Sequence, residues 1–402
     1  MQTIKKVFKY GPGPSSSHTI GPKNAVEDFL SEGIEFDYID ADLYGSLALT
    51  GKGHLTDKII IKTALPIEAR VHLKYGLNNL EHPNTLILKG YKDDLLISTH
   101  TYFSIGGGEI VKDGVMNDHH HDANIYPFAT GEEIRGYLNV TGIDDVIEIV
   151  DRCEDKDINE FLGDIVDKML ACVDRNLKAE GLIPGELRLK RVAKNIFETA
   201  QDLPREEKVP MLLTAFAYAA AEGNASGDEV VTSPTCGSSG VIAALVYYEY
   251  NYKKVSKEKI IDGLKVAGLI CNIAKELATI SGAVGGCQAE IGVASAMAAG
   301  MLAHMEGFQI QTIDYAAEVA MEHFLGLTCD PVKEYVQVPC IERNGVGVLH
   351  AYSSFLYAKN ISPFRKGIVS MDDAFRAMKL TGDSLNTDYK ETSKGGLAKV
   401  IK

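Results

Sequence analysis

The sequence lacks the long apolar runs of a membrane protein. No stretch reaches the roughly 18 apolar residues that span a bilayer, and the N-terminal segment MQTIKKVFKYG carries lysines without an apolar run after them. Basic residues are also in deficit, because 41 Lys and Arg stand against 55 Asp and Glu, a net charge of −14. This charge repels phosphate backbones and anionic membrane surfaces. We therefore expect a cytoplasmic protein that binds neither nucleic acid nor membranes.

The pattern of a disulfide framework is also absent. The 402-residue chain has seven cysteines, an odd number at irregular spacing, unlike a small secreted protein. We expect reduced thiols, with a metal site among them as an open alternative. The cysteines are Cys153, Cys172, Cys236, Cys271, Cys287, Cys329 and Cys340.

The first 150 residues are typical of an α+β domain. Runs of β-branched residues alternate there with Gly and Pro, a pattern that predicts short strands and a few helices. Strands are expected at residues 57–62, 85–90, 94–99 and 144–150.

The rest of the chain is typical of an all-α domain, because it is rich in Ala and Leu at helical spacing. The acidic segment DRCEDKDINE interrupts the strand pattern before it. The predicted division is therefore an α+β domain over 1–150, a linker over 151–168 and a helical domain over 169–402. Helices are expected at residues 158–177, 210–223, 240–250, 260–280, 290–307 and 313–326.

The most unusual segment is GPGPSSSHTIGP, which begins at Gly11. Its last residue, Pro22, suits the first turn of a helix, where a missing N–H costs nothing. The preceding loop therefore feeds a helix N-terminus, where hydroxyls and free N–H groups can hold a carboxylate or phosphate. A plain serine-rich cap is the equally weighted alternative. The polar side chains of the loop are Ser15, Ser16, Ser17, His18 and Thr19.

Other segments give weaker signals. The glycine-rich stretches GSLALTGKGHLTD (45–57) and SIGGG (104–108) match neither the phosphate-loop nor the dinucleotide-binding pattern, so hairpin turns are the simpler interpretation. His82, in EHPNT, is by default a structural loop histidine. The segment MNDHHHD (116–122) is interpreted as a solvated loop in preference to a metal site.

Three cysteines, Cys287, Cys329 and Cys340, lie in turn-forming sequence. Cys287 precedes a predicted helix whose dipole would stabilise a thiolate. Three thiolates would hold an iron–sulfur cubane at three corners and leave one iron open. An open iron is a Lewis acid that binds a hydroxyl and a carboxylate together, as dehydration of a hydroxy acid requires. Zinc or ordinary buried thiols remain alternatives.

Together these segments resemble the iron–sulfur-dependent L-serine dehydratases (L-serine ammonia-lyases), in a single-chain form. Many long motifs occur in one order over most of the chain. They are GPSSSHTIGP (13–22), YGSLALTGKGHLTD (44–57), HPN (82–84), YFSIGGG (102–108), NASGDEVVTSPTCGSSGVIAALVYY (224–248), SGAVGGCQAEIGVASAMAAG (281–300), MEHFLGLTCDPVKEYVQVPCIERN (321–344) and YKETSKGGLA (389–398).

The resemblance implies a [4Fe-4S] cluster and no pyridoxal phosphate. It implies an N-terminal domain like the allosteric substrate-binding domains of some phosphoglycerate dehydrogenases, a helical catalytic domain, an active site between the two, and a homodimer. By carry-over, the cluster ligands are Cys287, Cys329 and Cys340, the site histidines are His18 and His82, and the substrate-binding residues are Ser15, Ser16, Ser17 and Thr19.

The implied reaction is the deaminating dehydration of L-serine, a step of amino-acid catabolism that also serves gluconeogenesis. The open iron polarises the bond from carbon to the hydroxyl, and a base removes the α-proton. His18 is the first choice as base and His82 the second. Loss of water gives aminoacrylate, whose imine tautomer hydrolyses to pyruvate and ammonia.

Three departures from the family pattern stand out. The chain ends in KVIK without a cysteine after Cys340, so we expect no self-inhibiting cysteine tail on the open iron. The stretch between Asp57 and His82 is short, so we expect substrate control by the first domain to differ. Cys236 stands where some relatives have Asn, which argues against a ligand role.

Rival functions stay open at this point. The same scaffold suits an L-threonine dehydratase or an L-cysteine desulfhydrase. A pyridoxal-phosphate enzyme would need a Schiff-base lysine such as Lys52 and a phosphate loop such as the glycines at 106–108, but these lie in a strand-rich half without the expected helix. A serine-sensing module without catalysis is the rival from another class.

Overall fold

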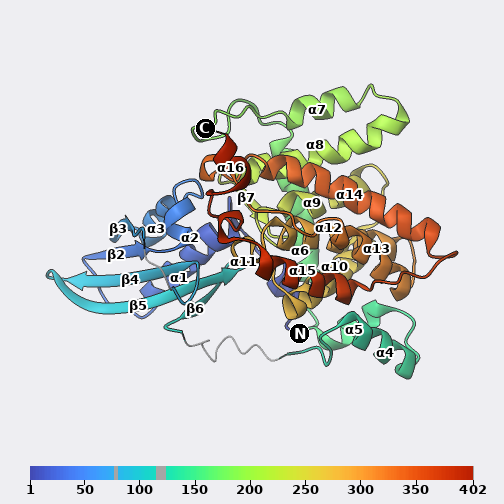
Figure 1. Cartoon of the computed structure of the whole chain (residues 1–402), viewed down its shortest axis with the longest axis horizontal. Coiled ribbons are helices and arrows are strands. Elements are labelled where there is room, and N and C mark those ends of the chain that lie inside the picture. Colours follow the sequence, from blue (N-terminus) through green and yellow to red (C-terminus); the bar gives the residue numbers. More distant parts are fainter. Residues whose placement is uncertain (77–79, 115–123, 402) are drawn as a thin grey trace.

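A five-stranded mixed sheet forms the N-terminal part of the computed structural model, which describes residues 1–76, 80–114 and 124–401. The strand order is β3-β2-β4-β5-β6, with β2 and β3 parallel and the other neighbours antiparallel. Figure 1 shows this sheet projecting from one side of the helical part. The strands are β2 (Tyr38–Leu43), β3 (Glu68–Leu73), β4 (Thr85–Lys92), β5 (Leu95–Gly106) and β6 (Glu109–Lys112).

Three helices accompany the sheet: α1 (Gly21–Leu30), α2 (Ser46–Thr50) and α3 (Thr56–Ala64). Residues of α1 and α3, including Phe29 and Ile60, form one apolar core with the inward side chains of the strands. The predicted α+β character of this part is confirmed.

The rest of the chain is predominantly helical, as predicted, and its helices pack around a second, larger apolar core (Figure 1). Among the described residues, no helix is both long and apolar enough to cross a bilayer. The helices are α4 (Gly131–Thr141), α5 (Val146–Cys153), α6 (Ile158–Asn176), α7 (Ala193–Ala200), α8 (Arg205–Ala225), α9 (Ser239–Asn251), α10 (Lys257–Leu277), α11 (Gly282–Gly285), α12 (Ile291–Met305), α13 (Ile310–Glu322), α14 (Cys340–Ile361), α15 (Met371–Ser384) and α16 (Gly396–Val400).

The first residues of the chain belong spatially to the helical part. Ile4 and Phe8 are buried in its core, and β1 (Tyr10–Pro12) pairs with β7 (Glu229–Val231) in a two-stranded antiparallel sheet. The chain then enters the sheet part and returns after β6. The turn around residues 13–20 is therefore held where the two parts meet.

Two of the four predicted strands are confirmed, since β4 covers 85–90 and β5 covers 94–99 almost entirely. The other two are wrong. Residues 57–62 lie in α3, where Thr56, Ile60 and Ala64 are buried at a spacing of four residues. Residues 146–150 lie in α5, and the carboxylate of Asp145 caps that helix by accepting a hydrogen bond from the N–H of Ile147. Helical spacing and a cap outweighed the β-branched composition.

The six predicted helical stretches are confirmed in α6, α8, α9, α10, α12 and α13. The division at residues 150–168 stays a prediction, and the core of the helical part also includes side chains that precede it, such as Ile134 and Ile149. The histidine-rich segment 116–122 lies outside the described residues.

Candidate active site

A small cavity lies where the sheet part meets the helical part. Pro14, Ser15 and His54 contribute from the N-terminal third of the chain. Every other lining residue comes from a helix, turn or loop of the helical part. These are Gly237, Cys287, Glu290, Ile291, Cys329, Pro331, Val336, Cys340, Arg343 and Glu391.

All three predicted cluster cysteines line this cavity, although they come from three separate elements. Cys287 begins a 3₁₀ turn (Cys287–Ala289) that leads into α12, and Cys340 is the first residue of α14. Cys329 follows α13, and its N–H donates a 2.8 Å hydrogen bond to the carbonyl of Tyr389. Loop and helix-terminus positions leave the three sulfurs free to face one point.

The sulfurs of Cys287 and Cys329 and a carboxylate oxygen of Glu290 lie within 4.8 Å of one another. A hydrogen bond from the Cys329 thiol, helped by the nearby Arg343, lowers the pKa of Cys287 to about 7. The pKa of Cys329 is raised by the same contact, and burial raises that of Cys340. By themselves the three thiols therefore favour a single shared negative charge.

Arg343 brings a fixed positive charge to the cysteines. Its guanidinium donates to the carbonyl of Thr328 at 2.7 Å and to Asp330 at 2.9 Å. Glu290, in contrast, holds a proton. Burial, followed by the charge of Cys287, raises the pKa of its carboxyl, and the hydroxyl of Thr235 donates a hydrogen bond to it at 2.7 Å. The site thus offers three sulfur ligands, one cation and one proton-holding carboxyl.

Beside the cysteines, two stacked histidines face one carboxylate. The rings of His18 and His54 have centroids 4.5 Å apart, and Nδ1 of His18 and Nε2 of His54 lie 3.6 and 3.5 Å from the same oxygen of Glu391. All three side chains are buried, and together they form a group that could hold a metal ion. We call this group the His–Glu–His cluster.

Hydrogen bonds determine which nitrogen of each ring carries a lone pair. Ser46 donates its only hydroxyl proton to the carbonyl of Glu391 at 2.8 Å, so its oxygen accepts from Nε2 of His18 at 3.0 Å. Nδ1 of His54 donates to the carbonyl of Thr50 at 2.8 Å. The lone pairs of Nδ1 of His18 and Nε2 of His54 therefore both point toward Glu391.

The hydroxyl of Ser17, 2.9 Å from Nδ1 of His18, donates to that lone pair, so among the described residues the lone pair on Nε2 of His54 is the one left without a donor. Burial lowers the pKa of His18 to about 4, so that ring stays neutral. Although burial opposes it, the two histidines lower the pKa of Glu391, which keeps its charge. His54, unlike His18, also lines the cavity.

The SSSHT segment is a helical turn, which corrects the predicted loop. Residues Ser16–Ile20 form a π-helical turn that continues into α1, and the oxygen of Ser15 caps it by accepting from the N–H of His18. The helix N-terminus thus lies at Ser15, seven residues before Pro22. This shift places the free N–H end of the helix at the cavity.

The four predicted substrate-binding residues lie in different surroundings. Ser15 lines the cavity, whereas Ser17 contacts Nδ1 of His18 at 2.9 Å. Thr19 donates to the carbonyl of His54 at 2.9 Å, and Ser16 is buried in the turn. Ser15 is therefore the one placed to meet a substrate directly, and the other contacts hold the histidines.

His82 lies outside the His–Glu–His cluster. Its Nδ1 accepts from the N–H of Asn84 at 3.1 Å, and its ring is 5.9 Å from that of Phe103. The next residue, Pro83, accepts from the N–H of Ser46 at 2.7 Å. The HPN segment thus supports the turn that holds His18, and His82 is absent from the residues that line the cavity.

Four residues of the site were not singled out from the sequence. His54 and Glu391 lie within the motifs 44–57 and 389–398, and only the fold brings them together. Glu290 and Arg343 each follow a cluster cysteine by three residues, a spacing that puts both side chains on one helix face. That three-residue spacing was the sequence signal that could have indicated Glu290 and Arg343 as site residues. Cys236 is fully buried and does not line the cavity.

Comparison with known proteins gives matches over nearly the whole chain. Residues 3–68 match the family described as serine dehydratase beta chain, and residues 64–398 match serine dehydratase alpha chain. The chain is 35% identical to L-serine dehydratase 1 of Escherichia coli, over 99% of both chains. It is 36% identical to L-serine dehydratases of Helicobacter pylori, over 100% of this chain and 99% of the relative, and of Streptomyces coelicolor, over 98% of each.

Proposed function

Because the chain belongs to the serine dehydratase family, we propose that it is a lyase that deaminates L-serine to pyruvate and ammonia in the cavity described above. One observation carries the proposal: three cysteines and the His–Glu–His cluster meet at a single cavity although the residues come from both parts of the chain. The full-length similarity to L-serine dehydratases supports the substrate.

We propose a [4Fe-4S] cluster on Cys287, Cys329 and Cys340. The donor set fits, since three buried or part-buried cysteines line one cavity together with Arg343, whose guanidinium would balance thiolate charge. Three thiols that share a single charge would all ionise on binding iron. When bound, the cluster would supply a Lewis-acidic iron for the substrate hydroxyl and carboxylate.

The side chains of this protein would bind and orient the substrate. Ser15 and the helix N-terminus that it caps present donors suited to the carboxylate of L-serine. The protonated carboxyl of Glu290 lies beside Cys287 and has a proton to give to departing hydroxide. Both roles follow from burial at the same cavity.

His54 is proposed to accept the α-proton at Nε2. That atom carries the lone pair, His54 lines the cavity, and Glu391 at 3.5 Å would stabilise the imidazolium that forms. His18, the first choice from the sequence, is proposed as the positioning residue that packs behind His54. His82, the second choice, is proposed to support the turn at Ser46. In place of the predicted substrate binding, Ser17 is proposed to hold the ring of His18 and Thr19 the backbone of His54, and Ser16 is proposed to be a buried residue of the turn.

Anaerobic assays test the proposal. Purified protein should contain iron and sulfide and form pyruvate from L-serine faster than from D-serine, L-threonine or L-cysteine. Preference for L-threonine or L-cysteine would reassign the substrate, and a metal-free protein that still turns over L-serine would refute the cluster. No turnover of any of them would favour a serine sensor. Added pyridoxal phosphate should change nothing.

Replacement of a ligand gives the sharper test. Cys287→Ala leaves two sulfurs and should remove iron and reduce pyruvate formation to background. Cys153→Ala, at a thiol on α5 outside the cavity, is the matched control and should keep both. Iron analysis and the pyruvate assay are run on the same anaerobic preparations. Full iron and full activity in Cys287→Ala would contradict the ligand assignment.

We further propose a cytoplasmic homodimer with a role in amino-acid catabolism and gluconeogenesis. An oxygen-sensitive cluster and reduced cysteines suit the cytoplasm. The homodimer is what the family resemblance implies. Sedimentation velocity on the anaerobic protein should give twice the mass of one chain.

A further inference from the structure

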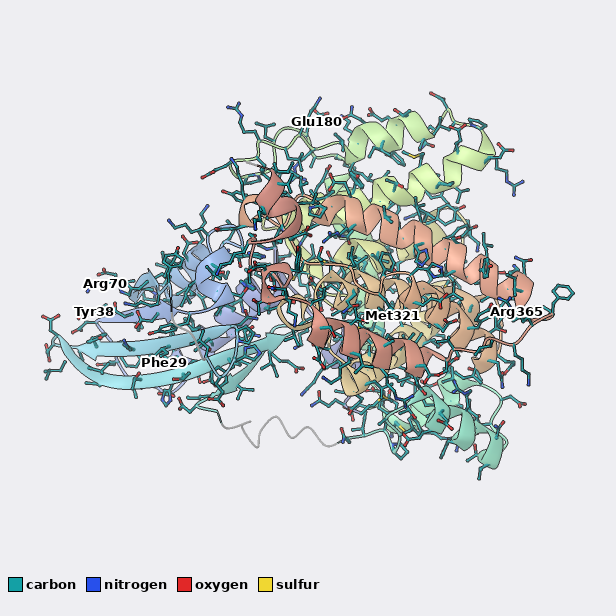
Figure 2. All side chains as sticks on the ribbon, in the orientation of Figure 1. Phe29, Tyr38, Arg70, Glu180, Met321 and Arg365 are labelled. Atoms are coloured by element: carbon teal, nitrogen blue, oxygen red, sulfur yellow. The ribbon has the colours of Figure 1, made fainter. Side chains whose placement is uncertain are left out.

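A second cavity, of about 560 Å³, lies on the helical part away from the cysteines. It is formed by α13, by the C-terminal half of α14 and by the segment 365–369 that follows α14. In Figure 2, Arg365 marks this place at the opposite end of the molecule from Tyr38 and Arg70 of the sheet. The volume falls within the range typical of small-molecule sites.

One wall of this cavity carries the carboxyl pair, Glu318 and Glu322 on α13. Glu318 is 3% exposed, and its carboxyl has no N–H or O–H partner among the described residues except the neighbouring carboxyl of Glu322. Burial and then that neighbour raise the pKa of Glu318 to about 8. The carboxylate of Glu322 lies 3.4 Å from Nδ1 of His323, but that nitrogen also contacts the carbonyl of Val319 at 2.8 Å. Among the described residues, no lysine or arginine pairs with either carboxyl, so a cationic ligand would stabilise the pair.

Another wall carries the basic pair, Arg365 and Lys366. Within the described part of the chain, neither forms an ion pair with a carboxylate; Arg365 contacts the hydroxyl of Tyr315. The acidic and basic walls therefore line the same cavity without neutralising each other. His350 adds no charge between them, since burial lowers its pKa.

The remaining lining is largely apolar, with Val319, Tyr357, Ile368 and Val369. A metal ion fits poorly, because within the described residues no three ligand atoms of this cavity lie within 4.8 Å of one another. A simple anion would meet the carboxyl pair, and a simple cation would meet the basic pair. A molecule that carries both charges satisfies both walls.

We propose that this cavity binds a free amino acid with an apolar side chain, its ammonium group on the carboxyl pair and its carboxylate on the basic pair. The side chain lies against the apolar lining. Because α14 begins at Cys340 and reaches this cavity at His350, about 15 Å along the helix, one rigid element connects the second cavity with the first.

L-Valine is the probe, because it has no hydroxyl to eliminate. Isothermal titration of the anaerobic full-length protein should show one L-valine bound per chain. Isobutylamine, which lacks the carboxylate, and 3-methylbutanoate, which lacks the ammonium group, should each bind at least tenfold more weakly. Absence of L-valine binding, or equal binding of either analogue, would overturn the proposal.

Variants assign the binding to this cavity. Arg365→Gln combined with Lys366→Gln, and separately Glu318→Gln, should each weaken L-valine binding at least tenfold. The matched control is Lys359→Gln, at a lysine on α14 that pairs with Glu306. This variant should bind L-valine as tightly as the wild type. If Glu318→Gln fails to fold, the variant with both Arg365→Gln and Lys366→Gln decides whether L-valine binds in this cavity, because those two side chains are exposed. His54→Gln should leave binding unchanged, and its loss there would instead locate L-valine in the first cavity.

Discussion

At the residue scale, the proposal that His54 is the base rests on where each imidazole lone pair lies. Both rings are buried, but His54 lines the cavity and has its Nε2 beside Glu391, whereas His18 is absent from the residues that line the cavity. Removal of a general base costs about 10²- to 10⁴-fold in rate. His54→Gln should therefore lower kcat by that factor while iron content and KM for L-serine change little.

The histidine His72 provides the control for this prediction. It lies on β3, where its ring is partly exposed and 3.4 Å from Asp40. His72→Gln should keep wild-type kcat. A His54→Gln enzyme that retains more than a tenth of the activity would show that another group takes the α-proton.

Buried His18 makes stability depend on pH. Its pKa is about 4 in the folded protein and ordinarily 6.5, because burial disfavours the charged ring. Between these values the unfolded chain binds more protons, so the free energy of unfolding falls as pH decreases from 6.5 to 4. The contribution is about 3 kcal/mol, from about 1.4 kcal/mol for each pH unit. Urea unfolding at a series of pH values should show this loss in the wild type and a smaller one in His18→Gln.

The difference between the two pH dependences is the measurement, since His18→Gln also removes contacts at every pH. His72→Gln is unfolded in parallel to correct for the loss of one histidine. Equal slopes for wild type and His18→Gln between pH 6.5 and 4 would contradict a neutral, buried imidazole.

At the element scale, the turn before α2 holds His18 in place. Gly45 has a φ of +58°, and a Cβ added there would lie 2.2 Å from the carbonyl oxygen of Pro83. Gly45→Ala should therefore cost about 3 kcal/mol or more, from backbone strain and overpacking together. Activity should fall as well, because Ser46 follows directly and contacts His18.

Gly33 separates the two causes. Its φ is +73°, yet a Cβ there would meet nothing within 4 Å. Gly33→Ala should cost about 1 kcal/mol and leave activity intact. Thermal and urea unfolding of both variants provide the comparison, and similar losses in the two would mean that the contact with Pro83 is unimportant.

The sequence predicted helices best where the period was long. The Ala-rich stretches correctly predicted α6, α8 to α10, α12 and α13. The short β-branched runs at 57–62 and 144–150 fit a helix as well as a strand, so their composition did not distinguish the two. Helix α14 was missed because its first residues, after Pro339, are typical of a turn. The three cysteines were predicted because they stand at element ends, where thiols remain free.

The histidine partners were harder to predict. His54 and Glu391 are 337 positions apart, and backbone hydrogen bonds between Cys329 and residues 389–391 bring them together. No local periodicity records such a contact. The catalytic role predicted for His82 stays a prediction, and in the structure its motif contacts the site through the backbone of Pro83.

At the scale of the whole molecule, the chain crosses twice between its two parts, so the active site depends on both. The N-terminal residues anchor the first crossing: the N–H of Ile4 donates to Glu154 at 2.8 Å, and Asn272 donates to the carbonyl of Gln2 at 2.7 Å. The SSSHT turn begins at Ser15, eleven positions after Ile4. We infer that loss of the anchor loosens the turn that carries His18.

Ile4→Ala tests this coupling. Ile4 is fully buried against α10, where it occupies the space beside Gly268. Large-to-small changes at such sites cost about 2–5 kcal/mol, and kcat should fall because Ser15 and His18 lose their fixed position. Ile34→Ala, at a side chain 39% exposed near the sheet, should change neither stability nor rate. An Ile4→Ala protein that unfolds at a lower urea concentration but keeps wild-type kcat below its unfolding transition would contradict this coupling. The N-terminal anchor would then contribute to stability alone, and Asn224 and the sheet part would hold the turn.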